Sequence, residues 1–283
     1  MKKLQFDYWM EITYTEPATE CHYTIKCLPK DTDMQKIEDL KIEMMPQSNY
    51  QKGEDSFGNQ MVYDNLYWEH NRFGFHVHGV VKTGKTEDKE SFVGIYRYSH
   101  GLNKAGTQIK KYYNELMQKK MPSENKESAY TVAFHLMKNL YQDFIYEKYR
   151  TNIYTSAEDA WKMGCGVCQD YAHILIALCH LAHIPARYVA GMMVGEGFSH
   201  AWVEVFCDDH WIGLDPTNGC AVDDSYIRIN IGRDANDCLI NKGIVKGGGM
   251  QTQTVRVCVE EFGANKGETF YDKNSSICGT SCR

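Results

Sequence analysis

Three short segments between residues 166 and 218 place the strongest constraint on what this chain can fold into. The first, residues 166–170 (Gly-Val-Cys-Gln-Asp), opens an apolar run that suits a buried helix. The second, residues 199–205, alternates in the manner of a strand. The third, residues 215–218, ends the short apolar run that reads as the next strand. Together they carry a thiol, an imidazole and a carboxylate on one helix and two neighbouring strands.

Cys168 lies where a thiol becomes reactive. It follows Gly164 and Gly166, which permit a tight approach of the backbone, and it begins the expected helix. A cysteine attacks only as its thiolate, and the unpaired N–H groups of a helix N-terminus stabilise that anion. Asp170 also suits the first turn, where negative charge is favourable. The pattern therefore predicts Cys168 as a nucleophile.

His200 and Asp215 are the candidates for the base and for the group that orients it. His200 heads the second segment, so a strand would hold its side chain on a rigid element. Asp215 follows far enough along the chain for one strand, a hairpin turn at residues 207–210 and a returning strand. Antiparallel pairing would place the two side by side. A nucleophile, a base and an orienting carboxylate are the parts of a catalytic triad.

The three segments, in this order and spacing, resemble the transglutaminase-like superfamily of papain-type cysteine enzymes, specifically its bacterial branch of cysteine proteases. Residues 184–189 and the Gly-Arg-Asp at residues 232–234 are similar to the same branch. The resemblance implies an α+β papain-like core, in which the nucleophile begins a central helix packed on an antiparallel sheet. It also implies the triad Cys168, His200 and Asp215.

The N-terminal part of the chain reads as strands. Apolar residues alternate at period two, for example at Phe73, Phe75 and Val77, with turn residues between the runs. The segments at residues 14–17 and 55–59 also resemble the β-rich region that precedes the core in the bacterial branch. We expect a β-rich, sandwich-like domain over residues 1–100.

The period changes to helical spacing beyond this point. Helices are predicted within residues 103–120 and 123–150, with Ser123 as the cap of the second, and a short helix begins at Ser156. The enzyme core is expected over residues 101–283. Because no linker rich in Pro, Gly or Ser separates the two parts, the β domain should pack against this core.

Composition narrows the classes of partner. The chain has 283 residues, a formal net charge of −6, and apolar and charged fractions of 43% and 24%, as in an ordinary globular protein. Mild acidity gives no electrostatic support for nucleic acid. The sequence shows neither a signal peptide nor a run long enough to span a bilayer, so we expect no membrane partner and a cytoplasmic location.

The 11 cysteines suggest free thiols in a reducing compartment. Cys165 and Cys168 form a CxxC pair, but neither a thioredoxin-type setting nor a second zinc-ligand pair accompanies it. We interpret Cys165 as a bystander. Cys278 and Cys282 lie in a short Gly/Ser-rich tail, which favours disorder over a redox pair or metal partner.

Other side chains that could bind metal are less specific. His76 and His78 share one face of a strand, where they could bind a metal, although a solvated face is the commoner outcome. The aspartate pairs at residues 208–209 and 223–224 lack the alternating oxygen ligands of a calcium loop. We therefore predict neither a metal nor a cofactor.

Three further residues neighbour the triad in sequence: Gln169, Tyr171 and Trp202. They are candidates for the pocket wall or the oxyanion site. For Tyr171 and Trp202, core packing is an equally good interpretation, although alternation puts Trp202 on the same face as His200.

The expected activity is attack of Cys168 on an amide carbonyl through an acyl-thioester. Water as acceptor gives a cysteine peptidase or amidase, and we favour it. An amine acceptor gives a transglutaminase, and a non-catalytic binding protein on the same scaffold is the alternative of another class. The substrate would be a peptide, an isopeptide or a small amide; the sequence does not indicate an oligomeric state.

Overall fold

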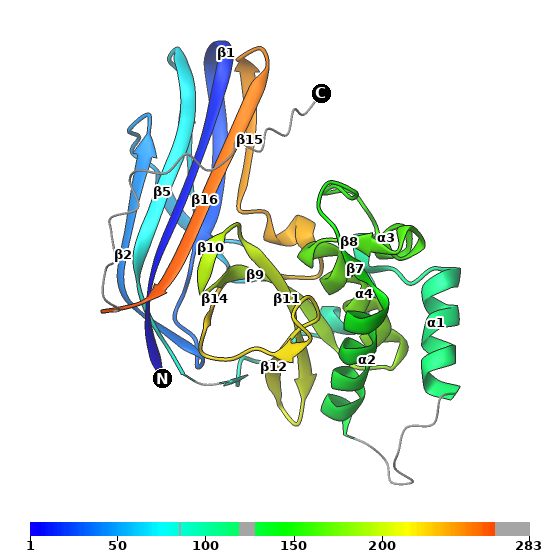
Figure 1. The fold of residues 1–283 in the computed structure, drawn as a ribbon. Helices are drawn as coiled ribbons and strands as arrows, with labels where there is room; N and C mark the ends of the chain where they lie inside the picture. Colours follow the sequence, from blue (N-terminus) through cyan, green and yellow to red (C-terminus); the bar gives the residue numbers. More distant parts are fainter. Residues whose placement is uncertain (85, 119–127, 264–283) are drawn as a thin grey trace.

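The computed structural model describes residues 1–84, 86–118 and 128–263. A tall β domain stands beside a second antiparallel sheet, whose far side carries the helices (Figure 1). This arrangement confirms the α+β class expected from the sequence.

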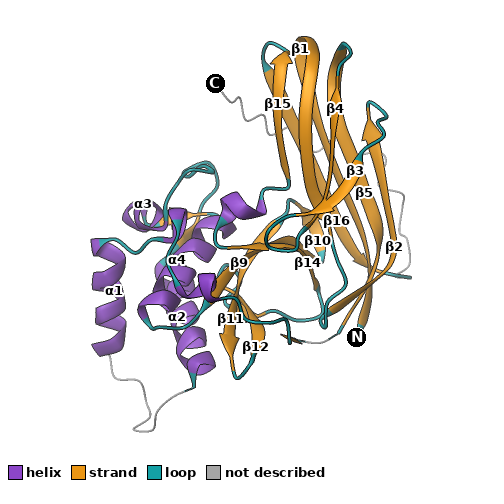
Figure 2. Ribbon diagram, turned by 180° about the vertical axis from the view of Figure 1, so that it is seen from behind, coloured by secondary structure: helices purple, strands orange, loops and turns teal. Residues whose placement is uncertain are grey.

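The β domain is one eight-stranded antiparallel sheet that folds over on itself (Figure 2). The first half of β1 pairs with β16 and β5, and its second half pairs with β15 and β4. Buried side chains of both halves meet in one core, so the domain is sandwich-like. Its strands are β1 (Lys2–Leu28), β2 (Gln35–Met45), β3 (Gln51–Glu54), β4 (Gln60–Leu66), β5 (His70–Thr83), β10 (Gly195–Gly197), β15 (Asn241–Gly247) and β16 (Gln251–Glu261).

Glycines form the bend between the two layers. Gly247, Gly248 and Gly249 have φ values of 82°, 83° and 61°, which side chains rarely allow. They join β15 to β16. Gly248 donates its N–H to the carbonyl of Pro17 (3.1 Å), so both long strands turn at the same place.

The C-terminal strands β15 and β16 complete the β domain by pairing with β1. The division at residue 100 stays a prediction about domains, but the sheet itself does not stop there. Which strands pair over such a separation depends on tertiary packing, which local periodicity does not encode.

The core sheet has six strands, in the order β13-β12-β11-β9-β14, with β6 added beside β12. Helix α4 packs on β11 and β9, and α1, α2 and α3 surround α4. The elements are β6 (Glu87–Asp88), α1 (Thr107–Gln118), α2 (Ala129–Asp143), α3 (Ala157–Met163), α4 (Cys168–Leu181), β9 (Ala186–Met193), β11 (His200–Cys207), β12 (His210–Asp215), β13 (Cys220–Ala221) and β14 (Tyr226–Gly232). Strands β7 (Ile145–Tyr146) and β8 (Cys165–Gly166) form a separate parallel pair, and three 3₁₀ turns are η1 (Gly94–Arg97), η2 (Gly101–Asn103) and η3 (Ala235–Cys238).

Helix starts follow capping chemistry. Ser156 caps α3 by accepting from the backbone N–H of Asp159, so this short helix begins where the sequence predicted. The cap of α2 is Ser128, which accepts from the N–H of Thr131. The prediction of Ser123 as this cap is wrong, because α2 starts five residues later; Ser123 itself lies outside the described residues.

The β domain packs against the core sheet, as the missing linker predicted. Met192, Ile227 and Ile229 of the core sheet are buried in the apolar core of the β domain. Gln35 of β2 is buried beside them and hydrogen-bonds both backbone groups of Arg228, through Nε2 (2.8 Å) and Oε1 (2.8 Å). Shared apolar contacts and buried hydrogen bonds thus join the β domain to the core sheet.

A buried ion network lies within the core sheet. Glu204 accepts from Arg187 (2.7 Å) and Arg228 (3.1 Å), and all three side chains are at most 3% exposed. Burial alone would raise the pKa of Glu204, but the two guanidinium groups lower it below its usual range. The pair of arginines therefore keeps Glu204 ionised. In the described part of the chain, no helix has the length and apolar character needed to cross a membrane.

Candidate active site

Cys168 occupies the first position of α4, directly after the short strand β8. The carboxylate of Asp170 accepts from the N–H of Val167 (2.8 Å) and from the hydroxyl of Thr151 (2.6 Å). It therefore caps the helix whose N-terminus faces the thiol. Burial raises the pKa of Asp170, which these hydrogen bonds oppose.

Gly166 is required for this cap. A Cβ at position 166 would lie 2.5 Å from Oδ2 of Asp170, closer than atoms tolerate. The glycine before the nucleophile thus leaves room for the carboxylate that fixes the helix start.

His200 begins β11 and is held on two sides. Its Nε2 lies 2.8 Å from Oδ2 of Asp215, and it also hydrogen-bonds Cys168. Because Asp215 occupies Nε2, the nitrogen left for Cys168 is Nδ1. Burial alone would lower the pKa of His200, but the bonds to Asp215 and Cys168 raise it to about 10. The imidazole is therefore protonated near neutral pH.

Asp215 ends β12 and is fully buried. Besides His200, Oδ2 accepts from Nδ2 of Asn218 (2.7 Å) and from the hydroxyl of Tyr226 (2.8 Å). The backbone N–H groups of Thr217 and Asn218 donate to Oδ1. Burial raises the pKa of Asp215, but these donors outweigh it and lower the pKa below its usual range. The carboxylate is thus fixed in place and charged.

Antiparallel pairing of β11 with β12 brings His200 and Asp215 together, and packing of α4 on β11 adds Cys168. The structure therefore assembles the three predicted residues into one hydrogen-bonded series.

The three predicted neighbours lie differently. Gln169 is half-buried beside Cys168. Tyr171 is buried and donates its hydroxyl to the carbonyl of Phe144 (2.5 Å). Trp202 is also fully buried, and its ring stacks on that of His200 at 6.3 Å between centroids. Of the two interpretations, core packing therefore applies to Tyr171 and Trp202. Both side chains are buried, and the ring of Trp202 packs against His200.

The remaining cysteines divide by position. Cys165 is buried in β8, and both it and Cys168 are free thiols. Cys278 and Cys282 lie outside the described residues.

Two family models match the chain and together cover more than half of it. Residues 111–216 match the transglutaminase-like superfamily core, and residues 4–82 match the bacterial transglutaminase-like N-terminal region. The chain thus contains a transglutaminase-like superfamily core, preceded by a bacterial transglutaminase-like N-terminal region.

Known proteins align with this chain over different shares of its length. An uncharacterized protein of Mycobacterium leprae is 26% identical over 255 residues, 83% of this chain and 90% of that protein. One of Mycobacterium tuberculosis is 34% identical over 126 residues, 39% of this chain and 40% of that protein. The crystal structure of a “putative cysteine protease” from Cytophaga hutchinsonii aligns with a TM-score of 0.72 at 22% identity, covering 97% of this chain and 96% of that one. This last match supports the fold.

Tyr226 and Asn218 are parts of the transglutaminase-like site that sequence reasoning did not assign. Asn218 stands in the third segment, so the proximity of its amide to Asp215 could have been noticed. Tyr226 reaches Asp215 from β14, and nothing in its local pattern marks that contact.

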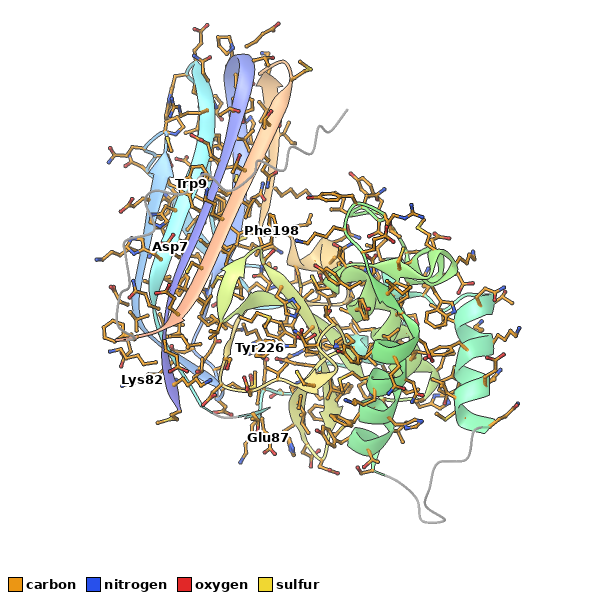
Figure 3. The ribbon with its side chains drawn as sticks, in the orientation of Figure 1. Asp7, Trp9, Lys82, Glu87, Phe198 and Tyr226 are labelled. Atoms are coloured by element: carbon orange, nitrogen blue, oxygen red, sulfur yellow. The ribbon has the colours of Figure 1, made fainter. Side chains whose placement is uncertain are left out.

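Two exposed aromatic side chains lie on segments close in structure or sequence to the thiol and the imidazole. Tyr146 of β7 is half-exposed, and burial together with the nearby Cys168 raises its pKa. Two residues before His200, the exposed ring of Phe198 lies between the β domain and the helices (Figure 3), with its centroid 5.4 Å from Nζ of Lys148. Tyr8 of β1 hydrogen-bonds Ser199, the residue before His200. The β domain therefore holds one border of the site.

Proposed function

We propose that this chain is a thiol-dependent acyl-transfer enzyme that attacks an amide carbonyl with Cys168. One observation carries the proposal: Nε2 of His200 lies 2.8 Å from Oδ2 of the buried Asp215, and the same imidazole hydrogen-bonds Cys168. A protonated histidine beside a cysteine at a helix N-terminus is the setting that stabilises a thiolate.

The chemistry follows from the positions. The Cys168 sulfur adds to the carbonyl carbon, and the tetrahedral intermediate collapses to a thioester as the amine leaves with the proton of His200. The now neutral imidazole takes a proton from the acceptor, which attacks the thioester. The acid or new amide leaves, and the thiolate–imidazolium pair returns. Asp215 keeps the ring oriented throughout.

The oxyanion would be bound at the start of α4. The N–H of Cys168 occupies the first helical position, where no partner exists within the helix. Such a donor stabilises the charge that develops on the carbonyl oxygen. Gln169, half-buried next to it, is the side chain in reach of the same region by sequence position.

Water is the acceptor that we propose, which makes the chain a cysteine peptidase or amidase. The description of the Cytophaga hutchinsonii protein as a “putative cysteine protease” supports this choice. Transfer to an amine is the second candidate, because the family model bears the transglutaminase name. The aromatic borders Tyr146 and Phe198 suit a peptide or isopeptide chain with apolar side chains.

Thiol labelling tests the nucleophile. Cys168, Cys220 and Cys258 all have partly exposed side chains, so exposure alone predicts similar rates of alkylation by iodoacetamide. We expect Cys168 to react at least about tenfold faster at neutral pH, because among these three it is the one that hydrogen-bonds an imidazole and begins a helix. Uniform slow labelling would instead indicate a binding protein on this scaffold.

Activity tests the reaction. Cys168→Ala should abolish cleavage of a peptide library, whereas Cys258→Ala should leave it unchanged. Reaction in ¹⁸O-labelled water with a fluorescent primary amine present separates the acceptors, since hydrolysis puts ¹⁸O into the product acid. Exclusive amine incorporation would reject hydrolysis but keep the nucleophile; an active Cys168→Ala protein would reject both.

A further inference from the structure

A second group of side chains that carry possible metal ligands lies on the outer face of the β domain, away from the helices. Strand alternation turns Phe75 and Val77 into the core and His76 and His78 outward. The two imidazoles stack at 4.6 Å between centroids, and their side chains are 26% and 28% exposed. The two histidines therefore share the outer face, as the alternation of the sequence predicted.

Strand pairing adds a carboxylate to these histidines. Glu43 of the neighbouring strand β2 is directly opposite His76 in the register. Its Oε2 lies 3.7 Å from Nδ1 of His76, and its Oε1 lies 3.7 Å from Nε2 of His78. Ligands about 2.1 Å from a tetrahedral metal are about 3.4 Å apart, so these three groups already have nearly the spacing of a coordination sphere.

Asp7 of β1 completes the arrangement from the other side. Its Oδ1 lies 2.9 Å from Nε2 of His76, so a neutral His76 donates Nε2–H to Asp7 and presents the lone pair of Nδ1 towards Glu43. Metal-binding histidines are commonly held by such a carboxylate on their second nitrogen. Figure 3 shows Asp7 on the β domain, far from the helices.

We propose that Glu43, Nδ1 of His76 and Nε2 of His78 bind a divalent transition metal, Zn²⁺ foremost, with Asp7 orienting His76. Two imidazoles and one carboxylate suit zinc and its neighbours, whereas Ca²⁺ and Mg²⁺ prefer oxygen ligands alone. Lys41, the nearest cation in the register, pairs with Asp39 at 3.9 Å.

Among the described residues, one other cluster of three histidine and carboxylate side chains is close enough to share a metal, and it contrasts with this one. Asp234 accepts from the backbone N–H groups of Leu102 and Asn236 as well as from His100, and Asp237 pairs with Arg233. These carboxylates already accept hydrogen bonds or ion pairs from the protein. Their contacts hold neighbouring loop segments together. Glu43 has only the two histidines as charge partners among the described ion pairs, and it is 69% exposed.

The metal would stabilise strand β2 at the edge of the sheet. Within the described residues, β2 pairs with β5 alone, so one side of β2 has no neighbouring strand. A metal held by Glu43 and both histidines would link β2 to β5. The bound protein should therefore resist thermal unfolding better than the metal-free one.

Titration of the full chain with Co²⁺ and Zn²⁺ tests the site. We expect one equivalent of Co²⁺ to give ligand-field bands without a thiolate-to-cobalt charge-transfer band, because no cysteine takes part. Glu43→Gln, at an exposed position that cannot disturb folding, should weaken binding at least about tenfold. Asp7→Asn should weaken it about 10- to 100-fold.

The controls separate this site from adventitious binding. His76→Asn with His78→Asn should abolish binding and the rise in melting temperature caused by Zn²⁺. His22→Asn changes a histidine of the same domain that contacts Asn65 instead, and should bind as the wild type does. Equal affinity in wild type and Glu43→Gln, or binding with a thiolate band alone, would overturn the proposal. Activity of Cys168 should be the same in all these variants, so failure here leaves the proposed reaction intact.

Discussion

Replacing Asp215 by Asn removes one charge from the site and little else. The amide has the same size, and its oxygen can still accept from the backbone N–H groups of Thr217 and Asn218. Its NH₂ group, however, would take the place of Oδ2 and face the Nε2–H of His200. Two donors then meet where a donor and a carboxylate met before.

The size of the effect follows from the pKa of His200. The gap between the ordinary value of 6.5 and about 10 corresponds to roughly 5 kcal/mol in favour of the imidazolium, at about 1.4 kcal/mol for each pH unit. Burial acts in the opposite direction, and the hydrogen bond to Asp215 is the first of the interactions that overcome it. Without it the imidazolium is lost near neutral pH. We expect kcat/KM to fall about 10²- to 10⁴-fold.

The assay is the pH profile of kcat/KM. In the wild type, activity on the alkaline side should fall only as pH approaches 10, where His200 loses its proton. In Asp215→Asn this limb should move several pH units lower. The same proton affects stability: its contribution is complete below pH 6.5 and is lost as pH rises through about 10, so urea unfolding of the variant should lack this dependence.

A matched control is available in Asp234, another fully buried aspartate with a histidine partner, His100. Asp234→Asn should lower stability but leave the alkaline limb unchanged. If Asp215→Asn keeps the wild-type limb and loses less than tenfold in rate, Asp215 does not hold the proton on His200 and the reasoning fails.

Two further substitutions test the scaffold of the site. Glu204→Gln leaves two buried arginines without their shared charge and should cost about 3–5 kcal/mol in urea unfolding, whereas the exposed Glu87→Gln should cost nothing measurable. Gly166→Ala forces a Cβ against Asp170, so we expect a loss of about 1–2 kcal/mol and at least a tenfold fall in kcat/KM. Gly94→Ala, where a Cβ meets nothing within 4 Å, is its control, and equal effects of the two alanines would contradict the account.

The site could be predicted where its chemistry is local in sequence. Cys168, His200 and Asp215 each stand in a segment of a few residues whose pattern also fixes its element, and a hairpin joins the last two. Tyr226 could not be predicted as a partner of Asp215, because the contact depends on where β14 is placed. Glu43 likewise meets His76 through a register that includes a bulge between Ile37 and Asp39, which alternation does not reveal.

The same limit applies to the fold. Buried alternation located β1 and β5, and helical spacing located α2, but two serines could have capped that helix and only Ser128 does. Exposed positions ahead of a helix offer similar caps, and packing decides between them. The pairing of β15 and β16 with β1 is decided by the finished structure in the same way.

The pairing of β1 with β16 joins the two ends of the described chain. Leu4 lies opposite Glu261, so β1 can pair with β16 only after the whole core has been synthesised. A protease cut near residue 95 would leave two fragments that still share one sheet and migrate together until denatured. Strand β10 pairs with β16 and is followed after two residues by His200. Disrupting the pairing of β10 with β16 would therefore change the position of the imidazole. The pairing of the first and last strands of the β domain therefore also fixes the segment that leads into His200.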